Sequence, residues 1–302
     1  MRKYTIRDFD RDFPDDDTCL EWLKDYLYPG GINCKLCGEV TKHHRVKSRP
    51  SYSCDRCGHH VHPMADTIYQ DTRTPLKLWF YATYLMAQTR CGISAKQIQR
   101  ETGVTYKTAW RMFNRIRSLL AEDIKDLSGT VETDETLMGG KRRYRHGEQA
   151  PRDAKGKVRR GRRAAIDENK TIVFGMVERQ GRVVAVTVPN VKTATLLPHL
   201  TERVLPKSTV YTDEAASYNS LAKAGYRHRR IAHAQKIYVR GNVHTNTIEG
   251  FWSLLKRGIG GVYHAVSAKY LQSYLNEYSF RYNHRDDEVP MFQTMLSRVE
   301  KA

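Results

Sequence analysis

Residues 243–256 read VHTNTIEGFWSLLK, and this stretch is the most informative in the chain because it begins a helix that carries an acid and a base. Glu249 and Lys256 lie seven residues apart, almost two helical turns, so both side chains leave the same face of that helix. Upstream, Asp134 in TVETDE and Asp213 in TVYTDE each follow a short run of β-forming residues. Two strand-borne aspartates, a helix-borne glutamate and a trailing lysine are the side chains that metal-dependent phosphate-ester chemistry requires.

The hydrophobic periodicity around these acids predicts an α/β domain over residues 128–288. We expect strands at 131–138, 171–178, 182–188 and 209–212, a weaker strand at 229–232, and helices at 194–204, 217–224 and from Asn246 onward. Asp134 lies in the middle of its strand. Asp213 lies at the C-terminal end of its strand, where ligand sites of open α/β sheets gather. Residues 289–302 follow as a tail.

The charge of the chain indicates a polyanionic partner. The net charge is +18 and the isoelectric point is near 9.7. Residues 141–163 alone hold eleven lysines and arginines against Glu148 and Asp153, together with several glycines. Such a segment cannot bury enough apolar surface to order itself. We therefore expect a basic loop at 141–165 that grips phosphate, although many charge runs are only solvated surface.

Four cysteines near the N-terminus have the spacing of a structural zinc site. A helical leader is expected over residues 1–30, and a zinc ribbon over residues 31–66. Two CxxC pairs separated by sixteen residues are typical of a ribbon with four thiolate ligands, here Cys34, Cys37, Cys54 and Cys57. Four thiolates leave no open position for water, so the expected Zn2+ is structural rather than catalytic.

A helix-turn-helix is predicted within residues 74–122. Pro75 opens a helix that runs through Gln88, and Ser94 begins the next one. The turn at residues 102–104 contains Gly103, and Thr105 caps a further helix that runs past Arg117. We expect Lys107, Arg111, Arg115 and Arg117 to point outward, toward DNA. A plain helical hairpin used as a spacer is the alternative.

Three segments of the chain resemble a known family. These are VETDETLMGGKRR at 131–143, VYTDEAASYNSL at 210–221 and the stretch from VHTNTIEGFW to RYNHR at 243–285. They are similar to DDE transposases of bacterial insertion sequences, of the ISXO-like group with a zinc-ribbon leader. The resemblance runs from about Cys34 to Arg285. It implies a ribonuclease H-like catalytic domain, preceded by a zinc ribbon and a helix-turn-helix.

The resemblance also implies roles for individual residues. It places the acidic triad on Asp134, Asp213 and Glu249, which would hold Mg2+ or Mn2+, and the basic residue on Lys256, which would contact phosphate. Some members of the family have asparagine in the third position, so Asn246 is an alternative ligand. Glu249 itself has a competing explanation, because Asn246 to Glu249 also fits a capping box. The DNA-binding residues we expect are Lys107, Arg111, Arg115, Lys141, Arg142, Arg143, Lys256 and Arg257.

These features together predict a transposase that binds terminal inverted repeats, cleaves DNA strands and transfers them to target DNA. Holding two transposon ends implies a homodimer or a larger assembly. A DNA-binding regulator without chemistry and a nuclease with the same metal site are the alternatives. No signal peptide or run of eighteen apolar residues is present, so no membrane partner is expected. We expect a soluble protein of the cytoplasm, associated with the nucleoid.

Overall fold

The computed structural model describes residues 4–139, 152, 170–231 and 244–300. These residues form two compact units, which we describe separately. The first consists of Met1–Leu120 with Asp286–Ala302, and the second of Ala121–Arg285. The expected basic loop, with Lys141, Arg142 and Arg143, lies outside the described residues except for Arg152.

The first unit begins with two capped helices and a small sheet. Thr5 and Asp15 accept backbone N–H bonds at the starts of α1 and α2, as N-cap residues do. Beyond them, three short strands form an antiparallel sheet in the order β1-β2-β3. The bounds are α1 Ile6–Asp12, α2 Asp16–Leu27, β1 His43–Val46, β2 Ser51–Cys54 and β3 His60–Val61.

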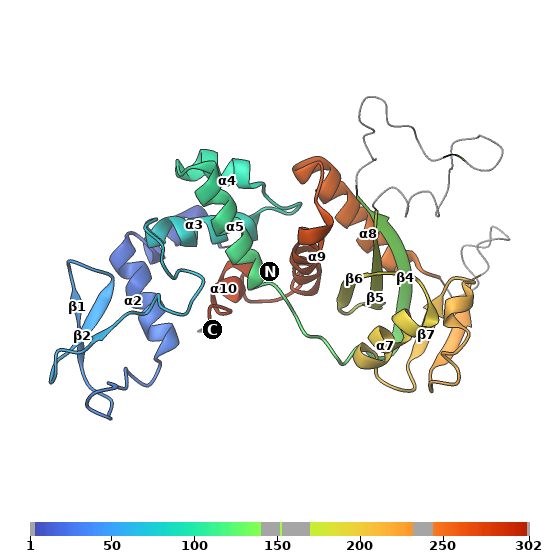
Figure 1. Ribbon diagram of the computed structural model, residues 1–302, viewed down its shortest axis with the longest axis horizontal. Helices are drawn as coiled ribbons and strands as arrows, with labels where there is room; N and C mark the ends of the chain where they lie inside the picture. The colour runs from blue at the N-terminus through green and yellow to red at the C-terminus, as the bar shows by residue number, and fades with distance from the viewer. Residues whose placement is uncertain (1–3, 140–151, 153–169, 232–243, 301–302) are drawn as a thin grey trace. The chain divides into compact units, whose positions relative to one another are not determined.

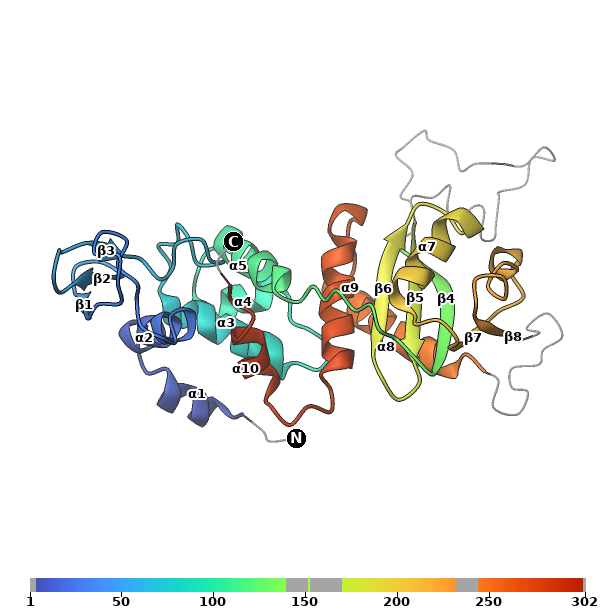
Figure 2. The same ribbon diagram turned by 90° about the horizontal axis from the view of Figure 1, so that it is seen from below.

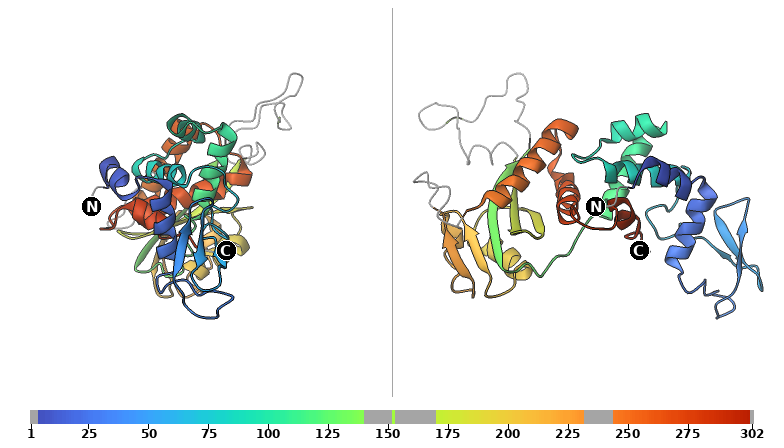
Figure 3. Two further views of the ribbon diagram at one scale, coloured as in Figure 1. Left: turned by 90° about the vertical axis from the view of Figure 1, so that its left-hand side faces the viewer. Right: turned by 180° about the vertical axis from the view of Figure 1, so that it is seen from behind.

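Four more helices complete the first unit: α3 Leu76–Gln88, α4 Ala95–Thr102, α5 Tyr106–Ser118 and α10 Met291–Leu296. Ser94 caps α4, Gly103 ends it in the left-handed conformation, and Thr105 caps α5, as the sequence predicts. Helix α10 lies within the segment expected to be a tail. It packs on α3 because Phe292, Met295 and Leu296 form an apolar stripe on one side of the helix. Figure 3 shows α10 in dark red.

The second unit is built on a five-stranded mixed sheet in the order β6-β5-β4-β7-β8 (Figure 1 and Figure 2). Strand β4 is central. It pairs antiparallel with β5 and parallel with β7, while β5 pairs antiparallel with β6 and β7 pairs parallel with β8. The bounds are β4 Thr130–Met138, β5 Thr171–Glu178, β6 Val183–Val188, β7 Thr209–Thr212 and β8 Arg227–Arg230. This order is that of a ribonuclease H-like domain and confirms the α/β class predicted for this part of the chain.

Helices cover both faces of this sheet (Figure 2). One face packs against α7 Thr193–Arg203 and the 3-10 turn η1 Ala216–Tyr218. The other packs against α8 Asn246–Gly258, a π-helical turn Ile259–Tyr263 and α9 Ala268–Asn283. The side chains of β5 alternate between the two cores, with Phe174 in the first and Val173 and Val177 in the second. Every residue of β4 therefore has a defined face.

One predicted element is wrong in kind. Residues 217–224 were expected to be a helix, but the structure has only the 3-10 turn at Ala216–Tyr218 followed by hydrogen-bonded turns. Tyr218 is buried, and its hydroxyl donates to the Glu135 carboxylate on β4. Leu221, three residues later, is buried in the same core. Tertiary anchoring of these side chains thus overrides the weak helical periodicity of the segment.

Candidate active site

Asp134 is the fifth of nine residues in β4 and is half-buried. Its side chain lies on the sheet face that α8 covers, because the indole Nε1–H of Trp252 donates to Asp134 Oδ2 at 3.0 Å. Trp252 itself is buried against Gly175 on β5, the residue that pairs with Asp134 across the strands. The central strand thus presents this carboxylate to α8 in a fixed orientation.

Asp213 directly follows β7, the strand that pairs with β4. The parallel pairing of β4 with β7 matches Glu132 to Tyr211, and two further residues along each strand lead to Asp134 and Asp213. Adjacent strands run about 4.8 Å apart, so continuing this register one residue past the end of β7 would bring Asp213 next to Asp134. Asp213 Oδ1 accepts the N–H of Ala215 at 2.9 Å, which holds the turn after the strand.

The hydroxyl of Thr212, just before Asp213, lies 2.9 Å from His228 Nε2 on β8. Burial, and secondarily the nearby Arg230, lower the pKa of His228, so the imidazole is neutral at pH 7. The neutral ring therefore places no positive charge next to Thr212, the residue before Asp213.

Glu249 and Lys256 both lie on the exposed side of α8, as their spacing predicts. Trp252 lies between them on the helix surface, three residues after Glu249 and four before Lys256, and it holds Asp134. The two helical side chains therefore flank the point at which α8 meets Asp134. Asn246, the alternative ligand, is exposed in the first turn of the same helix.

The capping explanation for Glu249 does not hold. The N-cap residue of α8 is Thr245, which places Glu249 at the fourth helical position instead of the third. The Thr245 hydroxyl donates to Glu249 Oε1 at 3.1 Å, and no helix-start N–H bond to Glu249 is formed among the described residues. The helix start is satisfied from elsewhere, so Glu249 is available for another role.

The residue that satisfies the start of α8 is Glu132, which our sequence reasoning did not place in the site. Its carboxylate is fully buried and accepts the backbone N–H groups of Thr247 and Ile248. The available signal was its position two residues before Asp134, which puts it on the same strand face. A buried glutamate in a central strand requires a partner, and α8 supplies one.

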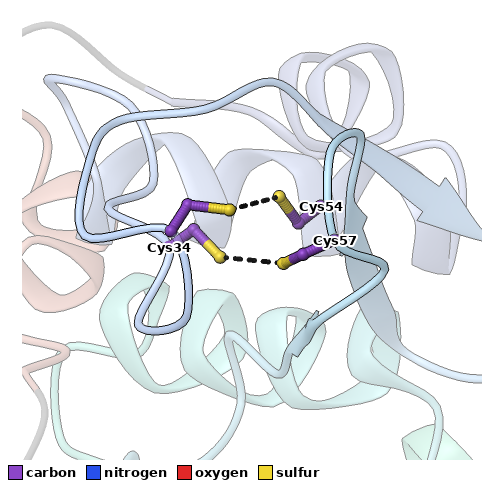
Figure 4. Close-up of side chains that lie close together, drawn as sticks. Cys34, Cys54 and Cys57 are labelled. Carbon is purple, nitrogen blue, oxygen red and sulfur yellow. Dashed lines mark hydrogen bonds between the residues drawn. The ribbon is translucent and has the colours of Figure 1, made fainter.

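Four cysteine thiols converge in the first unit, as predicted (Figure 4). Their sulfur atoms lie within 4.8 Å of one another, with Cys34 Sγ 3.5 Å from Cys57 Sγ and Cys37 Sγ 3.9 Å from Cys54 Sγ. Tetrahedral zinc with Zn–S bonds of about 2.3 Å requires sulfur separations of about 3.8 Å. The four thiols therefore fit one structural Zn2+. The Thr41 hydroxyl, 3.2 Å from Cys54 Sγ, is the largest of the influences that lower the pKa of that thiol.

Unlike the four thiols, the three candidate carboxylates do not form a close group of ligands in the described structure. Within the part of the chain that the structure describes, the cysteines are the one group of three or more potential ligands close enough to share an ion. Asp134, Asp213 and Glu249 are carried by β4, by the turn after β7 and by α8. Their oxygens are hard ligands of the type that Mg2+ and Mn2+ prefer, and like charges approach closely only around a cation.

Comparison with known proteins identifies the family. A model described as the ISXO2-like transposase domain matches residues 126–283, more than half of the chain, and a transposase zinc-ribbon domain matches residues 14–60. The chain belongs to the ISXO2-like transposases. This assignment confirms the resemblance found in the sequence and supports its zinc ribbon.

Relatives with known names agree with this assignment. An uncharacterized protein in transposable element ISH50 of Halobacterium salinarum is 28% identical over 265 residues, covering 86% of this chain and 88% of that protein. An uncharacterized transposase-like protein of Haemophilus influenzae is 35% identical over 121 residues, covering 40% of this chain and 95% of that protein. Among solved structures, the catalytic core domain of BIV integrase aligns with a TM-score of 0.34 and 14% identity, over 56% of this chain and 94% of that chain.

The predicted DNA-binding residues separate into two groups. Lys107, Lys256 and Arg257 are exposed. Arg111 and Arg115 are half-buried and donate to backbone carbonyls of the segment before α3, at residues 68 and 70. These two arginines therefore tie α5 to its own unit, whatever else they contact.

Arg117 was expected to point outward, and that expectation is wrong. Its side chain is fully buried, with the guanidinium 3.7 Å from the centre of the Phe113 ring. The sequence alone also did not single out the exposed aromatic side chains of α5, Tyr106 and Trp110, which lie one turn apart beside Lys107. The outward face of α5 is thus aromatic as well as basic.

Among the helices of the described residues, none has the length and apolarity needed to cross a membrane.

Proposed function

We propose that the protein is a DNA transposase that binds terminal inverted repeats and carries out metal-dependent strand cleavage and strand transfer. The observation that carries this proposal is the arrangement around β4. Asp134 lies on β4 and Asp213 directly follows β7, its paired neighbour, while α8, which holds Asp134 through Trp252, carries the exposed Glu249 and Lys256. Family membership supports the same reading.

Two divalent cations held by Asp134, Asp213 and Glu249 would supply an activated oxygen nucleophile and stabilise the leaving oxygen of a phosphodiester. The protein's own residues prepare for this. Trp252 keeps Asp134 turned toward α8, and the Ala215 N–H orients Asp213. Lys256, exposed on the same helix face as Glu249, would bind a phosphate oxygen of the DNA. Water and a DNA 3′-hydroxyl are both oxygen nucleophiles, so one site serves cleavage and strand transfer.

Recognition of the transposon ends is assigned to the first unit. Two observations support a helix-turn-helix role for α4 and α5: the Gly103 turn joins them, and α5 exposes Tyr106, Lys107 and Trp110. The net charge of +18 supplies the nonspecific attraction to phosphate. Because two ends must be joined to one target, the active species is a homodimer or a larger assembly on DNA.

The proposal is tested with the DNA that flanks the gene. Purified protein is incubated with the flanks and Mg2+, and strand breaks are mapped. Breaks at the tips of paired inverted repeats are expected, and EDTA should abolish them. Asp213→Asn should lose cleavage but keep DNA binding. Glu214→Gln, which alters the exposed acid next in sequence, is the matched control and should cut normally.

Two results would contradict the proposal. Undiminished cleavage by Asp213→Asn would remove this residue from the site. Tight binding of the flanks by the wild-type chain without any break would favour a DNA-binding regulator.

The same assay tests which residue is the third metal ligand. Glu249→Gln is expected to abolish cleavage, and Asn246→Ala is expected to retain it. The reverse result would assign the role to Asn246.

A further inference from the structure

Glu132 is a fully buried carboxylate whose two oxygens are both engaged. Oε2 accepts the backbone N–H groups of Thr247 at 2.8 Å and Ile248 at 3.1 Å. Oε1 accepts the Thr247 hydroxyl at 2.9 Å and Arg179 Nε at 2.7 Å, and His244 Nδ1 lies 3.5 Å away. An ionised carboxylate has about four acceptor positions, so the pocket around Glu132 uses nearly all of them.

These contacts replace the local cap that α8 lacks. A helix leaves its first four N–H groups without intrahelical partners, and its N-terminus carries a partial positive charge. Thr245, the N-cap residue of α8, makes no side-chain capping bond. Glu132 supplies both the acceptor and the negative charge from a strand 115 residues away in sequence. The start of α8 is therefore anchored to β4 instead of to its own turn.

A second contact joins the same strand and helix, at Asp134 and Trp252. Glu132 and Asp134 are two residues apart, about 6.6 Å along a strand. The helix rises about 6.8 Å between the Thr247–Ile248 pair and Trp252. Two contacts at separate points along both elements fix α8 against β4 more closely than either contact does alone. Glu249 lies between the two contact points on the helix.

Arg179 extends this arrangement to β7. Besides donating to Glu132, it donates from Nη2 to the His244 carbonyl at 2.9 Å. Its guanidinium carbon lies 4.7 Å from the centre of the Tyr211 ring, two residues before Asp213. The elements that carry all three predicted metal ligands thus meet around a single carboxylate.

We propose that Glu132 is a positioning residue: by holding the start of α8 against β4, it sets the separation of Glu249 from Asp134 and so the affinity of the site for its divalent cation. This inference rests on the proposed function, since it assumes that Glu249 and Asp134 serve one metal centre.

The test is Glu132→Gln. Glutamine keeps one acceptor oxygen but turns an NH2 group toward either the helix N–H groups or Arg179, so one set of bonds is lost while the size of the side chain is retained. Glu277→Gln is the matched control. Glu277 is also fully buried and paired with an arginine, Arg281, but it lies on α9 and does not contact α8 through its ion pair. Both variants should lose stability.

Two readouts separate positioning from stability. Hydrogen exchange of a peptide spanning residues 246–252 should be faster in Glu132→Gln and unchanged in Glu277→Gln. The Mg2+ concentration for half-maximal cleavage of flank DNA should rise about tenfold or more in Glu132→Gln, because supporting partners of metal ligands typically contribute this much to affinity. In Glu277→Gln it should stay within twofold of the wild-type value, and DNA binding should be the same in all three proteins.

Equal Mg2+ requirements for Glu132→Gln and the wild-type chain would overturn the inference, even if exchange at the start of α8 were faster, because Glu132 would then be only a structural cap. Failure of the proposed function has a different signature, namely a wild-type chain that cuts no flank DNA at any Mg2+ concentration. In that case Mn2+ binding measured by calorimetry decides the inference. About tenfold weaker binding by Glu132→Gln supports it, and unchanged binding overturns it.

Discussion

Gly175 is the position at which the packing of α8 on the sheet is most sensitive to one added methyl group. A Cβ atom at this residue would lie 2.5 Å from Trp252 Cζ2, 2.6 Å from Trp252 Cη2 and 2.9 Å from Ile248 Cδ1. Both neighbours are buried core side chains, so neither can swing aside into solvent. Gly175→Ala must therefore push α8 away from β5.

The cost follows from two effects. Overpacking a close-packed core costs roughly 1–3 kcal/mol. Displacement of the indole also weakens its hydrogen bond to the Asp134 carboxylate, and bonds to charged groups contribute about 1.5–3 kcal/mol. Because Asp134 is half-exposed and regains water, we take the lower end of this second range. The free energy of unfolding should fall by about 3 kcal/mol, which corresponds to a Tm about 9 °C lower for a domain of this size.

Differential scanning calorimetry measures this loss. The transition of the second unit is identified as the one that zinc chelation leaves unchanged, because the cysteine site lies in the first unit. Gly250→Ala is the control. Gly250 is an exposed residue within α8 whose added Cβ would meet nothing within 4 Å, so alanine should stabilise the helix by about 0.5–1 kcal/mol. A Gly175→Ala variant that melts within a degree of the wild-type chain would refute the described packing of Trp252 on β5.

Three further outcomes are expected. Elemental analysis of the wild-type chain should find one zinc per chain. Cys34→Ser should lose this zinc, whereas Cys91→Ser, outside the cluster, should keep it. Arg115→Ala should lower the free energy of unfolding by about 2 kcal/mol because Arg115 donates to two backbone carbonyls. Lys107→Ala, at an exposed residue, should leave the melting temperature unchanged and weaken DNA binding in a fluorescence anisotropy titration. The pKa of His228 is lowered from 6.5 in the folded chain, so the unfolded chain takes up this proton at a higher pH than the folded chain does. The free energy of unfolding should therefore fall as pH drops through 6.5. His228→Asn should flatten this part of a curve of unfolding free energy against pH, and an unaltered slope would contradict the assignment.

Much of the fold was predictable because local patterns and tertiary packing agree. The strand at 209–212 was predicted with the bounds that β7 has, and the strands at 131–138 and 171–178 differ from β4 and β5 by at most one residue. Alternating or continuous β-branched runs bounded by turn residues carry this information locally. The CxxC pairs are equally local, since their spacing already limits where the four thiols lie.

The candidate site was only partly predictable. The spacing of Glu249 and Lys256 places both on one face of α8 without any tertiary information. The sequence did not reveal that Glu132, rather than Glu249, caps α8. Glu132 and its partner Thr247 are 115 residues apart, and the residues from Asn246 to Glu249 also fit a local capping box. The burial of Arg117 was hidden for a related reason, since a helical pattern does not tell which basic residue faces a neighbouring element.

The sequence by itself determined which residue types this protein has for chemistry, in what order they occur and on which helices and strands they lie, since strand and helix periodicities are properties of short segments. Only the tertiary structure decided how those segments meet. The parallel pairing with β7 brings the strand that carries Asp134 next to the strand that precedes Asp213, and the contacts of Glu132 and Trp252 set α8 against β4. These are long-range contacts made by packing and by the need of buried polar groups for partners, and no local pattern specifies them.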